Sequence, residues 1–192
     1  MLNKKRTVKL LSASVLTGSI LGLSPIYSES AQLSNQPVNH ISQESQQESD
    51  TLNQLYHFAF MGKMPYTAKN LTINQNTKED VRSQFGPPPK LPGDDDAFDY
   101  YHAEMGQPGF AFAYHKDGTI SEIRYFGTNV ERQQNLGSIT PKVLKTQLGL
   151  PNDIRLVPYT GEINYVFKTG QYELHFIVGD DQTVDHVNLI EG

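Results

Sequence analysis

The acidic run between residues 94 and 104 holds the side chains of this sequence best suited to acid–base chemistry. Asp94–Asp96 are consecutive, Asp99 and Glu104 follow, and His102 stands between these two. Paired carboxylates beside a histidine can supply the general acid and the general base of a hydrolase. Pro92-Gly93 precede the run and favour a solvated loop, whereas catalytic carboxylates usually need burial to tune their pKa values. A calcium site is disfavoured, because three consecutive carboxylates do not alternate as the ligands of a calcium loop do.

Other signatures of catalysis or cofactor binding are absent from the sequence. No serine lies in a G-x-S-x-G elbow, and there is no H-E-x-x-H, phosphate-binding loop or dinucleotide glycine motif. The lack of cysteine excludes a thiolate nucleophile, a disulfide framework and a cysteine zinc site. With a net charge of −5 and no basic patch in the domain, the chain is a poor candidate for nucleic-acid binding. We therefore expect a protein that is not an enzyme and has no cofactor or bound metal; an envelope hydrolase using the Asp94–Glu104 cluster is the alternative.

Histidines recur where strand alternation turns side chains away from the core. Segments 110–115, 120–126, 172–176 and 184–190 alternate so that one set of residues faces inward and the other outward. His102 joins the outward set if Tyr101 faces the core. The candidate binding face consists of His102, His115, Arg124, Glu173, His175 and His186, with the histidines accessible to solvent. Two alternatives stay open: a polar face that merely tolerates histidine, and a zinc site, which is disfavoured because no two histidines have ligand spacing within one element.

The elements that carry these residues are predicted to come in two copies. Thr77 and Thr140 each open a short helix that ends at Gly86 or Gly149, with a proline close behind. Three strand-like segments follow each helix, so repeat 1 spans about residues 72–127 and repeat 2 about residues 136–191. In the last strand of each copy the apolar spacing breaks the alternation, which predicts bulges near residues 121–122 and 185–186. The predicted fold is α+β: a twisted antiparallel sheet built from two helix–strand–strand–strand pseudo-repeats, with the short helices on one face.

The first fifty residues have the composition of export and spacer segments. Basic residues within Lys4–Lys9, the apolar stretch Leu10–Leu23 and small residues before Ala31 predict a cleaved secretory signal peptide over residues 1–30. A retained anchor is disfavoured, because this stretch is shorter than the ~20 apolar residues that span a bilayer. Residues 31–50 are rich in Gln and Ser and are predicted to form a disordered spacer before a single globular domain at 51–192. We expect a secreted or cell-wall-associated protein with no stable membrane anchor after cleavage.

Three sequence blocks resemble a known family. They are LTINQNTKEDV from Leu71, YHKDGTISEIRYFGTNVERQ at Tyr114–Gln133 and YELHFIVGDDQTVDHVNL at Tyr172–Leu189. These blocks are similar to the YjgB family of small secreted Bacillus proteins, which are built on a domain of unknown function. The resemblance covers the chain from about residue 50 onward. The family has no established catalytic residues, so the resemblance assigns no residue a role.

A more distant resemblance connects the two helix–strand units with the β-lactamase-inhibitor-protein fold. Relatives of that fold bind other proteins and are not enzymes, which implies an extracellular or envelope protein as partner. The chain has no Cys and no Trp, and it therefore lacks the disulfides and Trp contacts of the known inhibitors. The expected function is a secreted or cell-envelope, non-catalytic binding module whose partner the sequence does not identify.

Overall fold

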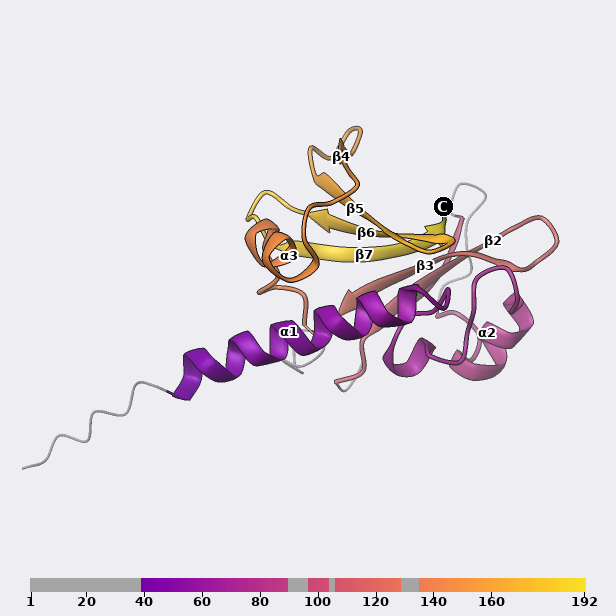
Figure 1. Cartoon of the computed structure of the whole chain (residues 1–192). Helices are drawn as coiled ribbons and strands as arrows, with labels where there is room; N and C mark the ends of the chain where they lie inside the picture. Colours follow the sequence, from indigo (N-terminus) through magenta and orange to yellow (C-terminus); the bar gives the residue numbers. More distant parts are fainter. Residues whose placement is uncertain (1–38, 90–96, 104–105, 129–134) are drawn as a thin grey trace, which may run out of the picture. The chain divides into compact units, whose positions relative to one another are not determined.

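The computed structural model describes residues 39–89, 97–103, 106–128 and 135–192, and Figure 1 shows their arrangement. The helices are α1 (Asn39–Ala59), the 3-10 helix η1 (Tyr66–Ala68), α2 (Lys78–Phe85) and α3 (Pro141–Leu148). The strands are β1 (Phe98–Tyr101), β2 (Gly109–Tyr114), β3 (Ile120–Gly127), β4 (Asp153–Leu156), β5 (Ile163–Thr169), β6 (Tyr172–Val178) and β7 (Val184–Glu191). None of the helices in these ranges is long and apolar enough to cross a membrane.

The seven strands form one sheet in the order β1-β2-β3-β7-β6-β5-β4. Every neighbouring pair is antiparallel. The predicted α+β class and the antiparallel sheet are therefore confirmed.

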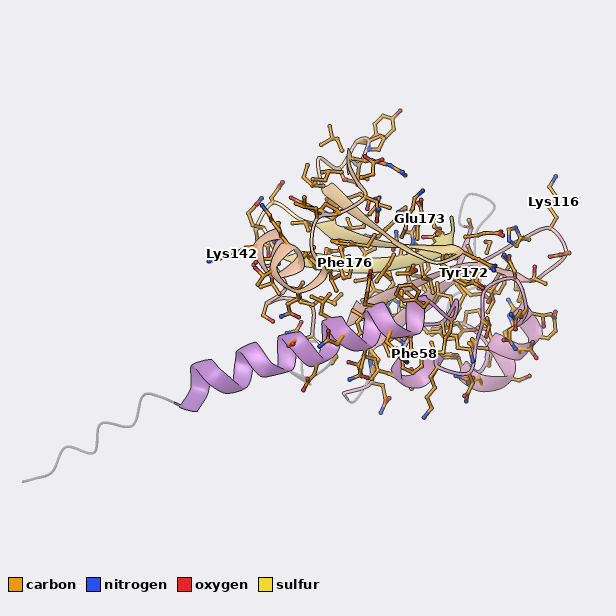
Figure 2. All side chains as sticks on the ribbon, in the orientation of Figure 1. Phe58, Lys116, Lys142, Tyr172, Glu173 and Phe176 are labelled. Carbon is orange, nitrogen blue, oxygen red and sulfur yellow. The ribbon has the colours of Figure 1, made fainter. Side chains whose placement is uncertain are left out.

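The hydrophobic core lies between the helices and one face of this sheet. Leu52 of α1, Val81 of α2 and Leu144 of α3 belong to the same buried cluster as alternate residues of the strands. The inward strand residues include Phe110, Phe112, Tyr125, Phe176, Val187 and Leu189. In Figure 2 the labelled Phe176 lies between the sheet and α1, whereas Glu173 lies on the opposite side of the same strand. We call that opposite side the outer face.

Both short helices begin where capping chemistry predicts. The Thr77 hydroxyl accepts from the Asp80 backbone N–H at 3.3 Å, and the Asp80 carboxylate accepts from the Thr77 N–H at 2.9 Å. These reciprocal bonds form a capping box. The Thr140 hydroxyl caps α3 by accepting from the Val143 N–H at 3.3 Å, without the reciprocal bond, because Val143 has no side-chain acceptor. The caps fix where each helix starts and therefore which residues reach the core.

Two bulges predicted from the apolar spacing are confirmed. Between β2 and β3 the register passes from the pair 113–122 to the pair 114–120, so Ser121 is the extra residue. Between β6 and β7 it passes from 177–186 to 178–184, which makes Asp185 the extra residue. An inserted residue shifts the alternation by one, so apolar residues on both sides of each bulge face the core.

Helix α1 extends into the segment predicted to be a spacer. It begins at Asn39, so residues 39–50, expected to be disordered spacer, are helical. Gln and Glu have good helix propensity, and extending an existing helix costs far less than nucleating one. The buried residues Leu52 and Leu55 hold the C-terminal part of α1 on the core and supply that nucleus. Residues 31–38 and the predicted signal peptide at 1–30 lie outside the described residues.

Strand β4 was not predicted. It pairs only with β5 and forms the edge of the sheet, in a segment expected to be a loop. All four of its residues are exposed. Its four residues do alternate between polar and apolar, and this short alternation was the sequence signal that could have predicted the strand.

Candidate functional site

The outer face of the sheet brings together four of the six residues of the predicted binding face. Arg124 on β3 lies opposite Asn188 on β7, which in turn lies opposite His175 on β6. Glu173 lies two positions before His175 and therefore shares its side of β6. His186 likewise lies two positions before Asn188 on β7. Register across three neighbouring strands thus places Arg124, Glu173, His175 and His186 on one surface.

A series of ring contacts runs across this face and begins at the guanidinium of Arg124. The aromatic–arginine cluster consists of Phe98, Tyr100, Arg124, Phe126 and His186. The Cζ atom of Arg124 lies 4.0 Å from the centre of the Phe98 ring, a cation–π distance, and its Nε donates to Glu122 Oε1 at 2.7 Å. Ring centroids lie 5.9 Å apart for Phe98–Tyr100, 6.4 Å for Tyr100–Phe126 and 5.6 Å for Phe126–His186. The cluster joins β1, β3 and β7, and Phe126 remains 36% exposed.

His175 is buried, which corrects the expectation that all the histidines of this face are accessible. It is 7% exposed and stands between the buried Asn188 and Val166 on the neighbouring strands. The Asn164 amide nitrogen can only donate, so His175 Nδ1 accepts from it at 3.0 Å. The other ring nitrogen, Nε2, then carries the hydrogen and donates to Glu173 Oε2 at 3.0 Å. The imidazole therefore links β5 and β6 through hydrogen bonds and presents little surface to a partner.

His102 and His115 do not join the outer face, contrary to the prediction. Strand β1 ends at Tyr101, so strand alternation no longer sets the direction of His102. His115 lies in the turn between β2 and β3, where its Nε2 is 2.9 Å from Asn74 Oδ1 in the loop before α2. Both histidines are exposed. The prediction failed here because it extended a strand pattern beyond the ends of the strands.

His102 lines a pocket that sequence reasoning missed. The pocket has a volume of about 440 Å³, and its lining includes Thr67, Phe85, Pro87, Tyr101 and Pro108. Small-molecule sites commonly enclose ~300–1,000 Å³. Burial, reinforced by the nearby charge of Asp99, raises the pKa of Tyr101 to about 12, so its hydroxyl is a hydrogen-bond donor and not a base. The proline run 87–89 after α2 was the only sequence signal of this pocket.

Asp99 takes part in a structural ion pair on the helix side of the sheet. Its side chain is 0% exposed and accepts from Arg82 Nε at 3.2 Å and from the Tyr114 hydroxyl at 3.2 Å. The hydrogen bond to Asp99 raises the pKa of Arg82. The pKa of Tyr114 is also raised, mainly by burial and then by the Asp99 charge. These bonds tie α2 to β1 and β2.

The other acidic members of the hydrolase alternative, Asp94–Asp96 and Glu104, lie outside the described residues. Within the described ranges, no group of three His, Asp or Glu side chains could hold a metal ion. The carboxylate of Asp99 already accepts hydrogen bonds from Arg82 and from Tyr114.

Residues 52–190 match a family model described as Domain of unknown function (DUF4309). The chain belongs to the DUF4309 family. It is 48% identical over 187 residues to the Uncharacterized protein YjgB of Bacillus subtilis (strain 168), covering 97% of this chain and 98% of that protein. A crystal structure of the DUF4309 family protein YjgB from Bacillus subtilis subsp. subtilis strain 168 matches with a TM-score of 0.74 and 56% identity. It covers 77% of this chain and 99% of that chain.

The predicted resemblance to the YjgB family is thus confirmed. An extracellular protein containing a SCP domain, from Bacillus anthracis, matches with a TM-score of 0.44 and 7% identity over 60% of this chain and 43% of that chain. The whole aromatic–arginine cluster falls within residues 52–190 and therefore belongs to the DUF4309 domain.

Proposed function

We propose that this DUF4309 protein is an exported, non-catalytic binding module that acts at the cell envelope or outside the cell. We propose that it binds a protein partner through the aromatic–arginine cluster. One observation carries this proposal: three aromatic rings and an arginine gather on the sheet face that the helices leave uncovered. The solvated face of an antiparallel sheet is ordinarily polar. Aromatic residues and Arg are enriched at the centres of protein interfaces and dominate their energetics.

The cluster is also held in place before any partner arrives. The Phe98 ring lies against the Arg124 guanidinium, and Glu122 accepts a hydrogen bond from Arg124 Nε. The Arg124 side chain nevertheless remains 27% exposed. A side chain that is already ordered loses little conformational entropy on binding. Glu122 and Asp185 place negative charge around the rings, and the Asp185 side chain is 61% exposed. We therefore expect a partner with an apolar centre and a basic edge, because complementary charge directs association.

Two further parts of the proposal concern export and internal duplication. The basic, apolar and small-residue order of residues 1–30 supports export through a cleaved signal peptide. Equivalent Thr caps on α2 and α3, and equivalent bulges at Ser121 and Asp185, support two pseudo-repeats at about residues 72–127 and 136–191. Such a duplication is the ground for relating the domain to the β-lactamase-inhibitor-protein fold, whose relatives bind proteins.

A pull-down with matched variants tests the binding surface. The full chain with a C-terminal tag is used to capture proteins from culture supernatant and cell-wall extract of the source organism. Phe126→Ala removes an exposed ring of the cluster, and Lys142→Ala is the control on the exposed side of α3. Truncating a central interface residue typically costs about 2 kcal/mol or more, about 30-fold in Kd.

We expect one protein to be retained by the wild type and by Lys142→Ala, and to be lost with Phe126→Ala. Unchanged thermal unfolding of Phe126→Ala would show that the fold is intact. Retention of the same protein by all three chains would place the binding surface elsewhere. Release of soluble products from the wall extract by the purified chain would favour the hydrolase alternative.

A further inference from the structure

Exposed apolar side chains concentrate at the sheet edge formed by β4. Leu150, Ile154, Leu156 and Tyr159 are 75%, 56%, 66% and 108% exposed. They make up four of the seven large apolar residues that are exposed within the described part of the chain. Single exposed apolar residues are ordinary, but four within ten residues are an unusual concentration, and exposed apolar surface of this kind often marks an interaction site.

The backbone of β4 can pair with another strand. β4 bonds to β5 on one side and ends the sheet on the other. The Val157 N–H donates to Glu162 O at 2.8 Å. Because backbone groups alternate in direction along an antiparallel strand, the N–H and C=O groups of residues 153, 155 and 157 point toward β5, and those of residues 154 and 156 point toward the free edge. At present Asp153 Oδ1 accepts from the Ile154 N–H at 2.8 Å. An edge strand of this kind is a template for a further strand.

We propose that β4 pairs with β4 of a second copy of this chain, antiparallel about a twofold axis, so that the two sheets become continuous. Ile154 pairs with Ile154 of the second copy, and each uses its outward N–H and C=O groups. In this register Asp153 lies opposite Arg155 of the second copy, and the twofold axis makes this contact twice. The strand is therefore complementary to itself in charge, which is the property that identifies a second copy as its partner.

The other registers that join the outward groups are unfavourable. Pairing residue 154 with residue 156 of the second copy brings the two Arg155 side chains directly opposite each other, and like charges in this position repel. Pairing residue 156 with itself sets Arg155 opposite Val157 of the second copy and so forgoes the contact between Asp153 and Arg155. Charge thus selects the register centred on Ile154.

The side chains of β4 can change partners at little cost. In the single chain Arg155 Nε donates to Asp153 Oδ2 at 2.6 Å, and both side chains are about half exposed, at 51% and 49%. In the paired strands the same groups meet across the axis at a non-hydrogen-bonded position, where opposite side chains are closest. Ile154 and Leu156 lie on the helix side, in register with Tyr165 and Ile163, and pairing removes their apolar surface from water.

Sedimentation equilibrium of the full chain tests this pairing. The concentration runs from about 10 µM to about 1 mM, because a short edge contact belongs to the class of small, weak interfaces. The weight-average mass of the wild type should rise toward twice that of the single chain. Asp153→Arg and Arg155→Asp should each remain at the mass of one chain, because every copy then opposes like charges. An equimolar mixture of the two variants should associate again, because each variant supplies the charge that the other needs.

A charge reversal on α3, Lys142→Glu, is the control and should associate like the wild type. Far-UV circular dichroism should be the same for all chains, because the β4 side chains are exposed. A wild-type mass that stays at one chain throughout would overturn the proposal. So would association of either single variant, or failure of the mixture to associate.

Discussion

Replacing Arg82 with Met should cost more stability than replacing its partner Asp99 with Asn. Both Arg82 Nε and an Arg82 terminal nitrogen donate to the Asp99 carboxylate, at 3.2 and 3.4 Å, but the two side chains are unequally buried. The Asp99 side chain is 0% exposed, whereas that of Arg82 is 36% exposed. Arg82→Met leaves a buried carboxylate with Tyr114 as its remaining side-chain donor. Asp99→Asn leaves a guanidinium that can turn toward water.

The difference in burial sets the expected magnitudes. Removing one partner while the other stays buried and charged costs about 3–5 kcal/mol, so this is the expected loss for Arg82→Met. Asp99→Asn keeps an acceptor for the Tyr114 hydroxyl and leaves no buried charge without a partner, so we expect the free energy of unfolding to fall by about 1–2 kcal/mol. In the double variant Arg82→Met/Asp99→Asn no buried carboxylate is left without its ion-pair partner. The double variant should therefore lose no more unfolding free energy than Arg82→Met alone.

Urea unfolding followed by circular dichroism at neutral pH measures these free energies, provided that the slope with denaturant is the same for each variant. Tyr114→Phe serves as a control that removes one hydrogen bond and no charge, with an expected loss of about 1 kcal/mol. Equal losses for Arg82→Met and Asp99→Asn, or strictly additive losses in the double variant, would refute the argument from unequal burial.

Gly62→Ala should destabilise the fold more than Gly118→Ala, although both glycines have positive φ, 69° and 88°. At Gly62 the new methyl group would collide with the Tyr172 ring, whereas at Gly118 it would meet open space. Equal thermal midpoints for the two variants would contradict this packing argument. Stability should also decline in acid, because backbone and side-chain hydrogen bonds from the threonine two residues later lower the pKa of Asp117 and of Asp181. A carboxylate whose pKa is lower in the folded state than in the unfolded state stabilises the fold at pH values above its unfolded-state pKa, and this stabilisation is lost as the pH falls through its folded-state pKa. Between about pH 6 and pH 2 the urea midpoint should therefore fall less for Asp117→Asn or Asp181→Asn than for the wild type. Identical pH profiles would argue against a role for these turns.

Predictions that depend on neighbouring residues in the chain were correct, and predictions that depend on contacts between distant segments were not. Caps at Thr77 and Thr140 and the bulges depend on a few neighbouring residues, and they were predicted correctly. Alternation also placed Arg124 on the correct face of the sheet. The same rule failed for His115, which lies in a turn, and it could not predict the burial of His175 by neighbouring strands.

Helices α2 and α3, six of the seven described strands and the outward direction of Arg124 were determined by the sequence alone. Side-chain periodicity and capping, which set these features, act within a few residues. Only the tertiary structure decided that Arg82 meets Asp99 across 17 positions and that Phe98 lies against Arg124. It also decided that β4 forms an exposed sheet edge. These contacts join elements that are far apart in the chain, and they depend on strand register, which the packing of the whole sheet sets.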